Sequence, residues 1–160
     1  TPVVSSAASD VYKRQCEIRG GIMFDAYHSS FLALWVILTT IIVQAIVYIR
    51  LHRRQRGYKV GVMDPTLGQT SFLFRAYRTF WNSIENIIPL FGIAILAILS
   101  EYDSLKLSII LWVYAISRII HMIIYYKVVT NKNPSLRSIP FGIGFLACFY
   151  LIVDLGIFLF

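Results

Sequence analysis

The hydrophobic positions of this chain gather in four long runs, and short segments between them hold most of the charged residues. Each run is roughly twenty residues long, which is the length an α-helix needs to cross a hydrocarbon layer about 30 Å thick. The pattern therefore predicts an all-α integral membrane protein, a four-helix bundle. The expected spans are residues 31–49, 75–99, 105–126 and 139–159.

The first 22 residues lack this pattern. The stretch TPVVSSAASDVYKRQ is polar, does not begin with Met and resembles the translated read-through of a sequencing adapter. We therefore predict a non-native or disordered N-terminal segment over residues 1–22. The four-helix transmembrane domain is expected over residues 23–160.

Composition and charge agree with a multi-pass membrane protein. Only 14% of the residues are charged, whereas soluble domains carry about 25%. The net charge is +7, but the basic residues follow the first and third spans, and Glu101 and Asp103 follow the second. Since basic connectors stay in the cytoplasm, both termini are expected on the other side, in a bacterial inner membrane or the endoplasmic reticulum. No basic face remains for nucleic acid, and the three histidines are too scattered for a metal site.

Polar side chains recur at helical spacing inside the second and third spans. They are Arg75, Arg78, Asn82 and Glu85 in the second span, and Arg118, His121 and Tyr125 in the third. Steps of three and four residues place each set on one helix face. Because the two spans run antiparallel, Glu85 and Arg118 are expected at similar depth, where they would form a structural ion pair. Together the two sets predict a polar cleft that opens toward the cytoplasm.

Two interpretations of this cleft remain open. Ion pairs and hydrogen bonds can simply hold transmembrane helices together. Alternatively, the cleft binds an anion, because its arginines outnumber its acids and the guanidinium fork suits carboxylates and phosphates. Charged side chains cost at least about 2.5 kcal/mol each inside a membrane, so we favour a functional site.

Three motifs resemble one protein family. The segment RAYRTFWNSIENIIPLF at residues 75–91 resembles the Arg…Asn…Glu…Pro signature of the MAPEG family, membrane-associated proteins in eicosanoid and glutathione metabolism. The third-span pattern R-x-x-H-x-x-x-Y is similar to that of its microsomal glutathione transferase and prostaglandin E synthase branch. Arg137 and Ser138 resemble the Arg-Ser pair that opens the family's fourth helix. The resemblance covers residues 29–160.

The resemblance implies a homotrimer that binds glutathione, as co-substrate, in cytoplasm-facing clefts between subunits. Carried over residue by residue, the glutathione-binding set is Arg50, Arg75, Arg78, Asn82, Glu85, His121 and Tyr125. Arg137 and Ser138 would lie near the sulfur and stabilise the thiolate. A lipophilic second substrate would arrive from the lipid bilayer, and no metal is implied.

The departures from the family pattern bear on the reaction. The connector between Tyr125 and Arg137 is longer than in the prostaglandin synthase branch, and Phe141 replaces an expected tyrosine. We therefore predict a glutathione-dependent transferase or peroxidase that acts on lipophilic electrophiles or lipid hydroperoxides, not prostaglandin synthesis in particular. One alternative is a non-catalytic lipid-binding or scaffold protein of the same fold, which would not bind glutathione. A second is a small transporter, which would usually show inverted repeats or broken helices.

Overall fold

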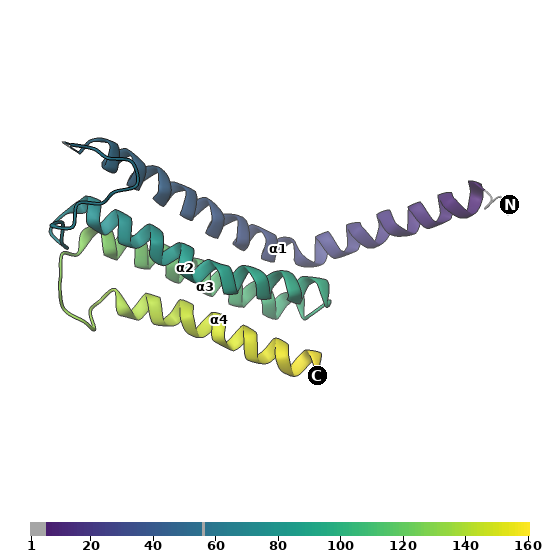
Figure 1. The fold of residues 1–160 in the computed structure, drawn as a ribbon. Helices are drawn as coiled ribbons and strands as arrows, with labels where there is room; N and C mark the ends of the chain where they lie inside the picture. Colours follow the sequence, from purple (N-terminus) through teal and green to yellow (C-terminus); the bar gives the residue numbers. More distant parts are fainter. Residues whose placement is uncertain (1–5, 56) are drawn as a thin grey trace.

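The computed structural model describes residues 6–55 and 57–160, and all its regular structure is helical. Four helices follow one another along the chain and lie side by side over most of their length (Figure 1). They are α1 (Ser6–Arg53), α2 (Phe72–Leu99), α3 (Ser104–Lys127) and α4 (Ser138–Leu159). The described ranges contain no strand. The predicted all-α architecture is confirmed.

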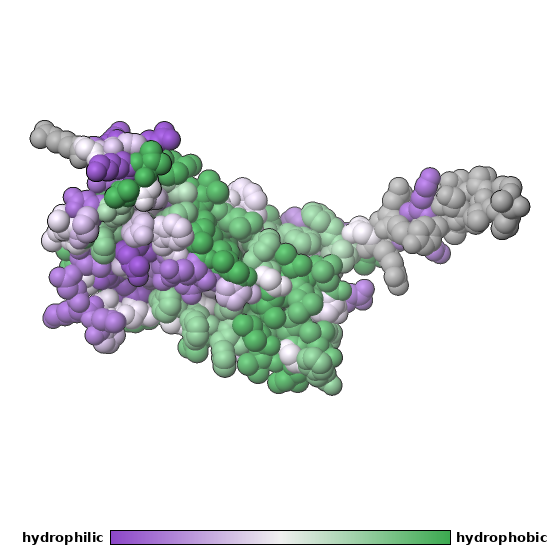
Figure 2. Space-filling view, viewed as in Figure 1, coloured by the Kyte–Doolittle hydropathy of each residue, from purple (hydrophilic) through white to green (hydrophobic). Residues whose placement is uncertain are grey.

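All four helices are long and apolar enough to cross a membrane. Their outer surface carries large apolar side chains, among them Trp35, Ile88 and Leu146, each of which is more than 60% exposed. Figure 2 shows this apolar surface along the helices and a polar surface gathered at the end where the α1–α2 and α3–α4 connectors lie. The protein is therefore an integral, multi-pass membrane protein with one strongly polar end.

Polar caps set where α2 and α3 begin. Ser71 precedes α2, and its hydroxyl accepts a hydrogen bond from the backbone N–H of Phe74. Asp103 precedes α3, and its carboxylate accepts one from the N–H of Lys106 at 2.8 Å. Such caps satisfy backbone donors that the first helical turn leaves free. As a result α2 begins three residues before the expected residue 75, and α3 begins one residue before the expected residue 105.

The N-terminal part of α1 differs from the expectation. Residues 6–22, which the sequence pattern assigned to a non-native or disordered segment, are helical, while residues 1–5 lie outside the described part. No proline interrupts the chain between residues 6 and 53, so each added residue extends an existing helix at little cost. Figure 1 shows this part projecting beyond the other three helices. Its non-native origin stays a prediction.

The core forms around α3, which packs against all three other helices. Leu107 and Leu111 on α3 are fully buried, as are Leu151 and Leu155 on α4. The α3–α4 contact is close at Gly144, where an added Cβ would lie 3.0 Å from Ser117 Oγ. Small residues allow helices in membranes to approach in this way.

A polar cluster ties the helices together at the end remote from the basic connectors. The hydroxyl of Tyr102, in the α2–α3 turn, donates to Asp154 on α4, and Lys106 on α3 forms an ion pair with the same carboxylate at 2.9 Å. Tyr27 on α1 donates to the backbone carbonyl of Tyr102. Burial, together with the bond to Asp154, raises the pKa of Tyr102 to about 12. Its hydroxyl therefore remains a donor at neutral pH.

Candidate functional site

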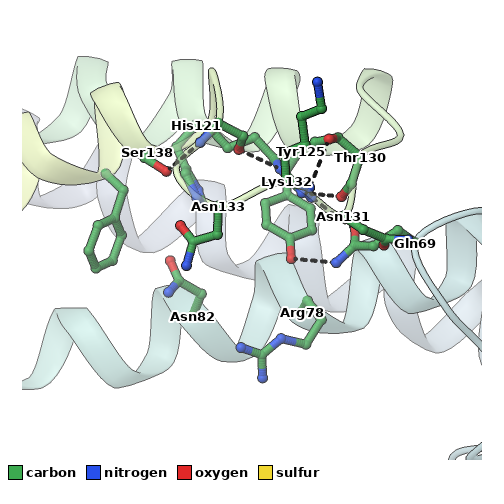
Figure 3. A pocket seen from close by; sticks show the side chains of 13 residues that line it. Gln69, Arg78, Asn82, His121, Tyr125, Thr130, Asn131, Lys132, Asn133 and Ser138 are labelled. Atoms are coloured by element: carbon green, nitrogen blue, oxygen red, sulfur yellow. Dashed lines mark hydrogen bonds between the residues drawn. The ribbon is translucent and has the colours of Figure 1, made fainter.

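A polar cavity of about 410 Å³ opens at the basic end of the bundle, among α2, α3, α4 and the two connectors (Figure 3). Its lining residues are Gln69, Arg78, Asn82, His121, Tyr125, Thr130, Asn131, Lys132, Asn133, Ser135, Arg137, Ser138 and Phe141. This volume falls within the range of about 300–1,000 Å³ typical of small-molecule sites. The cavity can therefore hold a ligand of metabolite size.

The structure brings many of the predicted site residues together in this cavity. Arg78, Asn82, His121, Tyr125, Arg137 and Ser138 all line it. Four of these belong to the two sets of polar residues at helical spacing on α2 and α3, and two come from the start of α4. Residues from both helices and from the Arg-Ser motif therefore line one cavity, and their roles at a ligand stay predictions.

Arg137 is the most tightly oriented cation of the cavity. Its side chain is only 8% exposed, and its guanidinium carbon lies 4.2 Å from the centre of the Tyr125 ring. Nη1 donates to Gln69 Oε1 at 2.9 Å, and Nη2 donates to the carbonyl of Thr130 at 2.6 Å. A guanidinium carries more N–H donors than these bonds use. Arg137 is thus held in place with donors left for a ligand.

His121 and Ser138 add two further polar side chains to the cavity wall. His121 is 4% exposed, and its Nδ1 has no hydrogen-bond partner among the described residues. Ser138 Oγ accepts a hydrogen bond from the backbone N–H of Ser135 at 3.1 Å. An oxygen that accepts through a lone pair keeps its own O–H free to donate.

The charge of the cavity is positive. Arg78, Lys132 and Arg137 contribute to its lining, and no aspartate or glutamate is among the described residues that line it. An arginine fork pairs best with carboxylates or phosphates. The arrangement therefore favours an anionic ligand.

Arg75 lies outside the cavity, although the resemblance placed it among the ligand-binding residues. It is 7% exposed, and Nη1 donates to the backbone carbonyls of Gln69 at 2.6 Å and Thr70 at 3.0 Å. Its Nε donates to the carbonyl of Tyr126 at 3.3 Å. Backbone carbonyls thus bind Nε and Nη1 of Arg75, and these bonds join the α1–α2 connector to the last turn of α3.

The expected ion pair between Glu85 and Arg118 is not formed. Arg118 is 5% exposed, and its Nη2 donates to Asn82 Oδ1 at 2.7 Å and to Ser83 Oγ at 3.2 Å. Glu85 is exposed on the outer face of α2. The difference lies in the direction around the helix: Asn82 and Ser83 face α3, whereas Glu85 does not.

Arg50 and Glu85 are both exposed, and neither lines the cavity of the single chain. Arg50 lies near the end of α1, and Glu85 lies inside the span of α2. The resemblance assigns both to a site between subunits, so their ligand-binding roles stay predictions.

The connectors supply cavity residues that the sequence did not identify. Gln69 comes from the α1–α2 connector, and Thr130, Asn131, Lys132, Asn133 and Ser135 come from the α3–α4 connector. Turn-rich composition marked the first of these segments only as a loop. For the second segment, the one available sequence signal was the polar run TNKN (residues 130–133), which follows the basic end of the third span.

Comparison with known proteins identifies the family of this chain. The model of the MAPEG family matches residues 30–157. This range includes the polar residues at helical spacing on α2 and α3, both connectors and the Arg137–Ser138 pair. No curated protein and no solved structure matches the chain at a significant level. The family match covers most of the sequence and agrees with four apolar helices, so the chain belongs to the MAPEG family.

Proposed function

We propose that this protein is a membrane-bound glutathione transferase or peroxidase that acts on lipophilic electrophiles or lipid hydroperoxides. The MAPEG family includes glutathione-dependent enzymes and non-catalytic members, so membership alone does not decide between them. The observation that carries the proposal is Arg137, a buried and oriented cation in the wall of a basic cavity, with neutral protein partners.

The chemistry of glutathione fits the cavity. The tripeptide carries two carboxylates, and Arg78 and Lys132 offer cations for them in addition to Arg137. Asn82, His121 and Tyr125 offer neutral polar groups beside these cations. In the proposed homotrimer, the exposed Arg50 and Glu85 complete the site between neighbouring copies, and Glu85 meets the ammonium of the tripeptide.

Arg137 and Ser138 would activate the thiol. A free thiol has a pKa of about 8.5, and a nearby cation lowers that pKa. Arg137 supplies the cation, and the O–H of Ser138 donates to the thiolate as the proton leaves for water. This arrangement keeps a larger fraction of the sulfur in its nucleophilic form at neutral pH.

The thiolate then reacts in one of two ways. In transfer, a sulfur–carbon bond forms as the electrophile's leaving group departs with the bond electrons. In peroxide reduction, the O–O bond breaks and a second glutathione completes the disulfide, which yields an alcohol and water. The bilayer supplies the lipophilic substrate, and Phe141 on the spanning helix α4 provides an apolar wall of the cavity. Holding both reactants together contributes much of the rate.

The decisive experiment measures the thiolate absorbance of glutathione bound to detergent-purified protein near neutral pH. We expect a signal in the wild type and a loss of at least about tenfold in thiolate in Arg137→Ala, since one pKa unit changes the ionised fraction about tenfold. Arg53→Ala is the matched control, because Arg53 is an exposed arginine at the end of α1 and is not among the cavity residues.

The outcome separates the remaining functions. No binding at millimolar glutathione would contradict the proposal and favour the lipid-binding or scaffold protein. Binding without a thiolate signal, combined with glutathione uptake into vesicles, would favour the small transporter. A thiolate signal equally strong in Arg137→Ala would remove Arg137 from the chemistry.

A further inference from the structure

We propose that Gln69 is a positioning residue of this site, whose neutral amide orients Arg137 and leaves the charge of Arg137 uncompensated. The inference rests on the proposed glutathione function and deepens it. Gln69 lies in the α1–α2 connector, two residues before the residue that caps α2.

The side chain of Gln69 bridges two elements of the cavity. Its Oε1 accepts a hydrogen bond from Arg137 Nη1 at 2.9 Å, and its Nε2 donates to the hydroxyl of Tyr125 at 3.5 Å. Figure 3 shows the amide of Gln69 directed at the Tyr125 hydroxyl. The same Tyr125 ring stacks against the Arg137 guanidinium. One amide therefore holds both members of the stacked pair.

Gln69 is itself held by its backbone. Its carbonyl accepts the 2.6 Å hydrogen bond from Arg75 Nη1, and Arg75 also bonds to the carbonyl of Tyr126 at the end of α3. Arg75 thus fixes Gln69 relative to α3, and Gln69 fixes Arg137. This chain of contacts explains how a connector residue can be a precise part of the site.

Within residues 6–55 and 57–160, the side chains and carbonyls that the structure describes as partners of Arg137 are all neutral. They are the Gln69 amide, the Thr130 carbonyl, a longer contact to Ser135 Oγ and the Tyr125 ring. The ion pair found among the described residues joins Lys106 and Asp154 instead. A carboxylate in the position of the Gln69 amide would orient Arg137 equally well, but it would cancel the positive charge. A glutamine here orients the guanidinium and keeps it available to an anion.

The test changes the charge at residue 69 and little else. Gln69→Glu keeps the shape of the side chain and places a negative charge within bonding distance of Arg137. A nearby charge of this kind shifts a pKa by about 1–3 units. We expect the pKa of the bound glutathione thiol to rise by about one unit or more, so that the thiolate fraction at neutral pH falls at least about tenfold.

The experiment is a pH titration of bound thiolate absorbance in the full-length, detergent-purified protein. Gln55→Glu is the matched control, because Gln55 belongs to the same connector, bonds to His52 and is not among the cavity residues. Its expected titration is that of the wild type. Thermal unfolding of each variant reports whether the fold is retained.

The outcomes separate the two proposals. An unshifted pKa in Gln69→Glu, beside a clear wild-type signal, would overturn the role of Gln69 and leave the glutathione function intact. An equal shift in Gln55→Glu would also overturn it, since the effect would then be long-range charge. A wild type without any thiolate signal would overturn the glutathione function and this inference together.

A second variant covers the case in which Gln69→Glu does not fold. Gln69→Met removes both hydrogen bonds at similar volume and adds no charge. With a chlorodinitrobenzene electrophile, we expect a lower kcat and little change in the KM for glutathione, the pattern of an interaction lost from the transition state. An unchanged kcat in the folded variant would overturn the positioning role.

Discussion

Three buried arginines of similar exposure have different partners, and the partners separate their roles. Arg75 is 7% exposed and donates to backbone carbonyls, whereas Arg118 is 5% exposed and donates to side chains of α2. Arg137 is 8% exposed, but it lines an open cavity. Burial of the charge is common to all three, so burial alone does not identify a ligand site. The open cavity beside Arg137 does.

Arg75→Ala is expected to lower the stability of the protein more than Arg78→Ala does. The first change leaves the carbonyls of Gln69, Thr70 and Tyr126 without their charged donor, and hydrogen bonds to charged groups contribute about 1.5–3 kcal/mol each. Arg78 is exposed and lines the cavity, so its loss should weaken glutathione binding while the melting temperature stays close to that of the wild type. Melting curves in detergent, with and without glutathione, measure both effects. A larger loss of stability in Arg78→Ala than in Arg75→Ala would contradict the structural role of Arg75 and support a ligand-binding role for it.

Sequence periodicity indicated that polar residues gather on one side of α2 and of α3, but not which of them face the neighbouring helix or which atoms they contact. The steps of three and four residues placed Arg78, Asn82, His121 and Tyr125 in one site. They did not reveal that Arg118 bonds to Asn82 and Ser83 in place of Glu85, because spacing along one helix does not fix its rotation against another. The sequence did not predict a role for Gln69 for a different reason. Its contact with Arg137 joins positions 68 residues apart, and both residues adjoin loops that have no periodic pattern.

At the scale of the helices, hydropathy predicted four long apolar helices but not where each of them begins. The polar residues Ser71 and Asp103 lower the local hydropathy, yet they start helices by bonding to backbone N–H groups. For this reason α2 begins at Phe72 and α3 at Ser104. The α1 extension was missed because a polar stretch without an apolar face carries no periodic signal.

The close contact between α3 and α4 gives a direct test of helix packing. A Cβ at Gly144 would lie 3.0 Å from Ser117 Oγ, whereas a Cβ at Gly142 would meet nothing within 4 Å. We expect Gly144→Leu to lower stability by about 1–3 kcal/mol, the usual range for overpacking. Gly142→Leu, on the same helix, should stay close to the wild type. Melting temperatures in detergent report both, and equal effects would contradict the close contact.

At the scale of the whole molecule, α2 presents polar groups where a single chain would meet lipid. Arg78, Trp81, Glu85 and Ile88 are all exposed, at steps of three and four residues along one face. A charge facing hydrocarbon costs at least about 2.5 kcal/mol. A neighbouring copy that covers this face would remove the cost, which supports the proposed homotrimer.

Cysteine cross-linking tests that arrangement. In a background with Cys16 and Cys148 replaced by serine, Ile88→Cys should form disulfide-linked chains in the membrane after mild oxidation. Ile109→Cys provides the comparison, since Ile88 is 69% exposed on α2 and Ile109 is 56% exposed on α3. We expect at least about tenfold more cross-linked product from Ile88→Cys, because only sites held within about 7 Å can be bridged without backbone movement. Equal yields would contradict a homotrimer in which the α2 faces meet one another around the symmetry axis.

The pairing of Arg118 with α2 has a consequence for how the chain enters the bilayer. Near the centre of an isolated helix, an arginine costs about 2.5–3.5 kcal/mol during insertion by the translocon. The acceptors of Arg118, on Asn82 and Ser83, lie on the helix that leaves the ribosome earlier, and only residues 100–103 separate the two helices. Helix α3 can therefore enter the membrane beside a helix that already carries the groups its charge requires. The order of synthesis supplies the acceptors before the cation that depends on them.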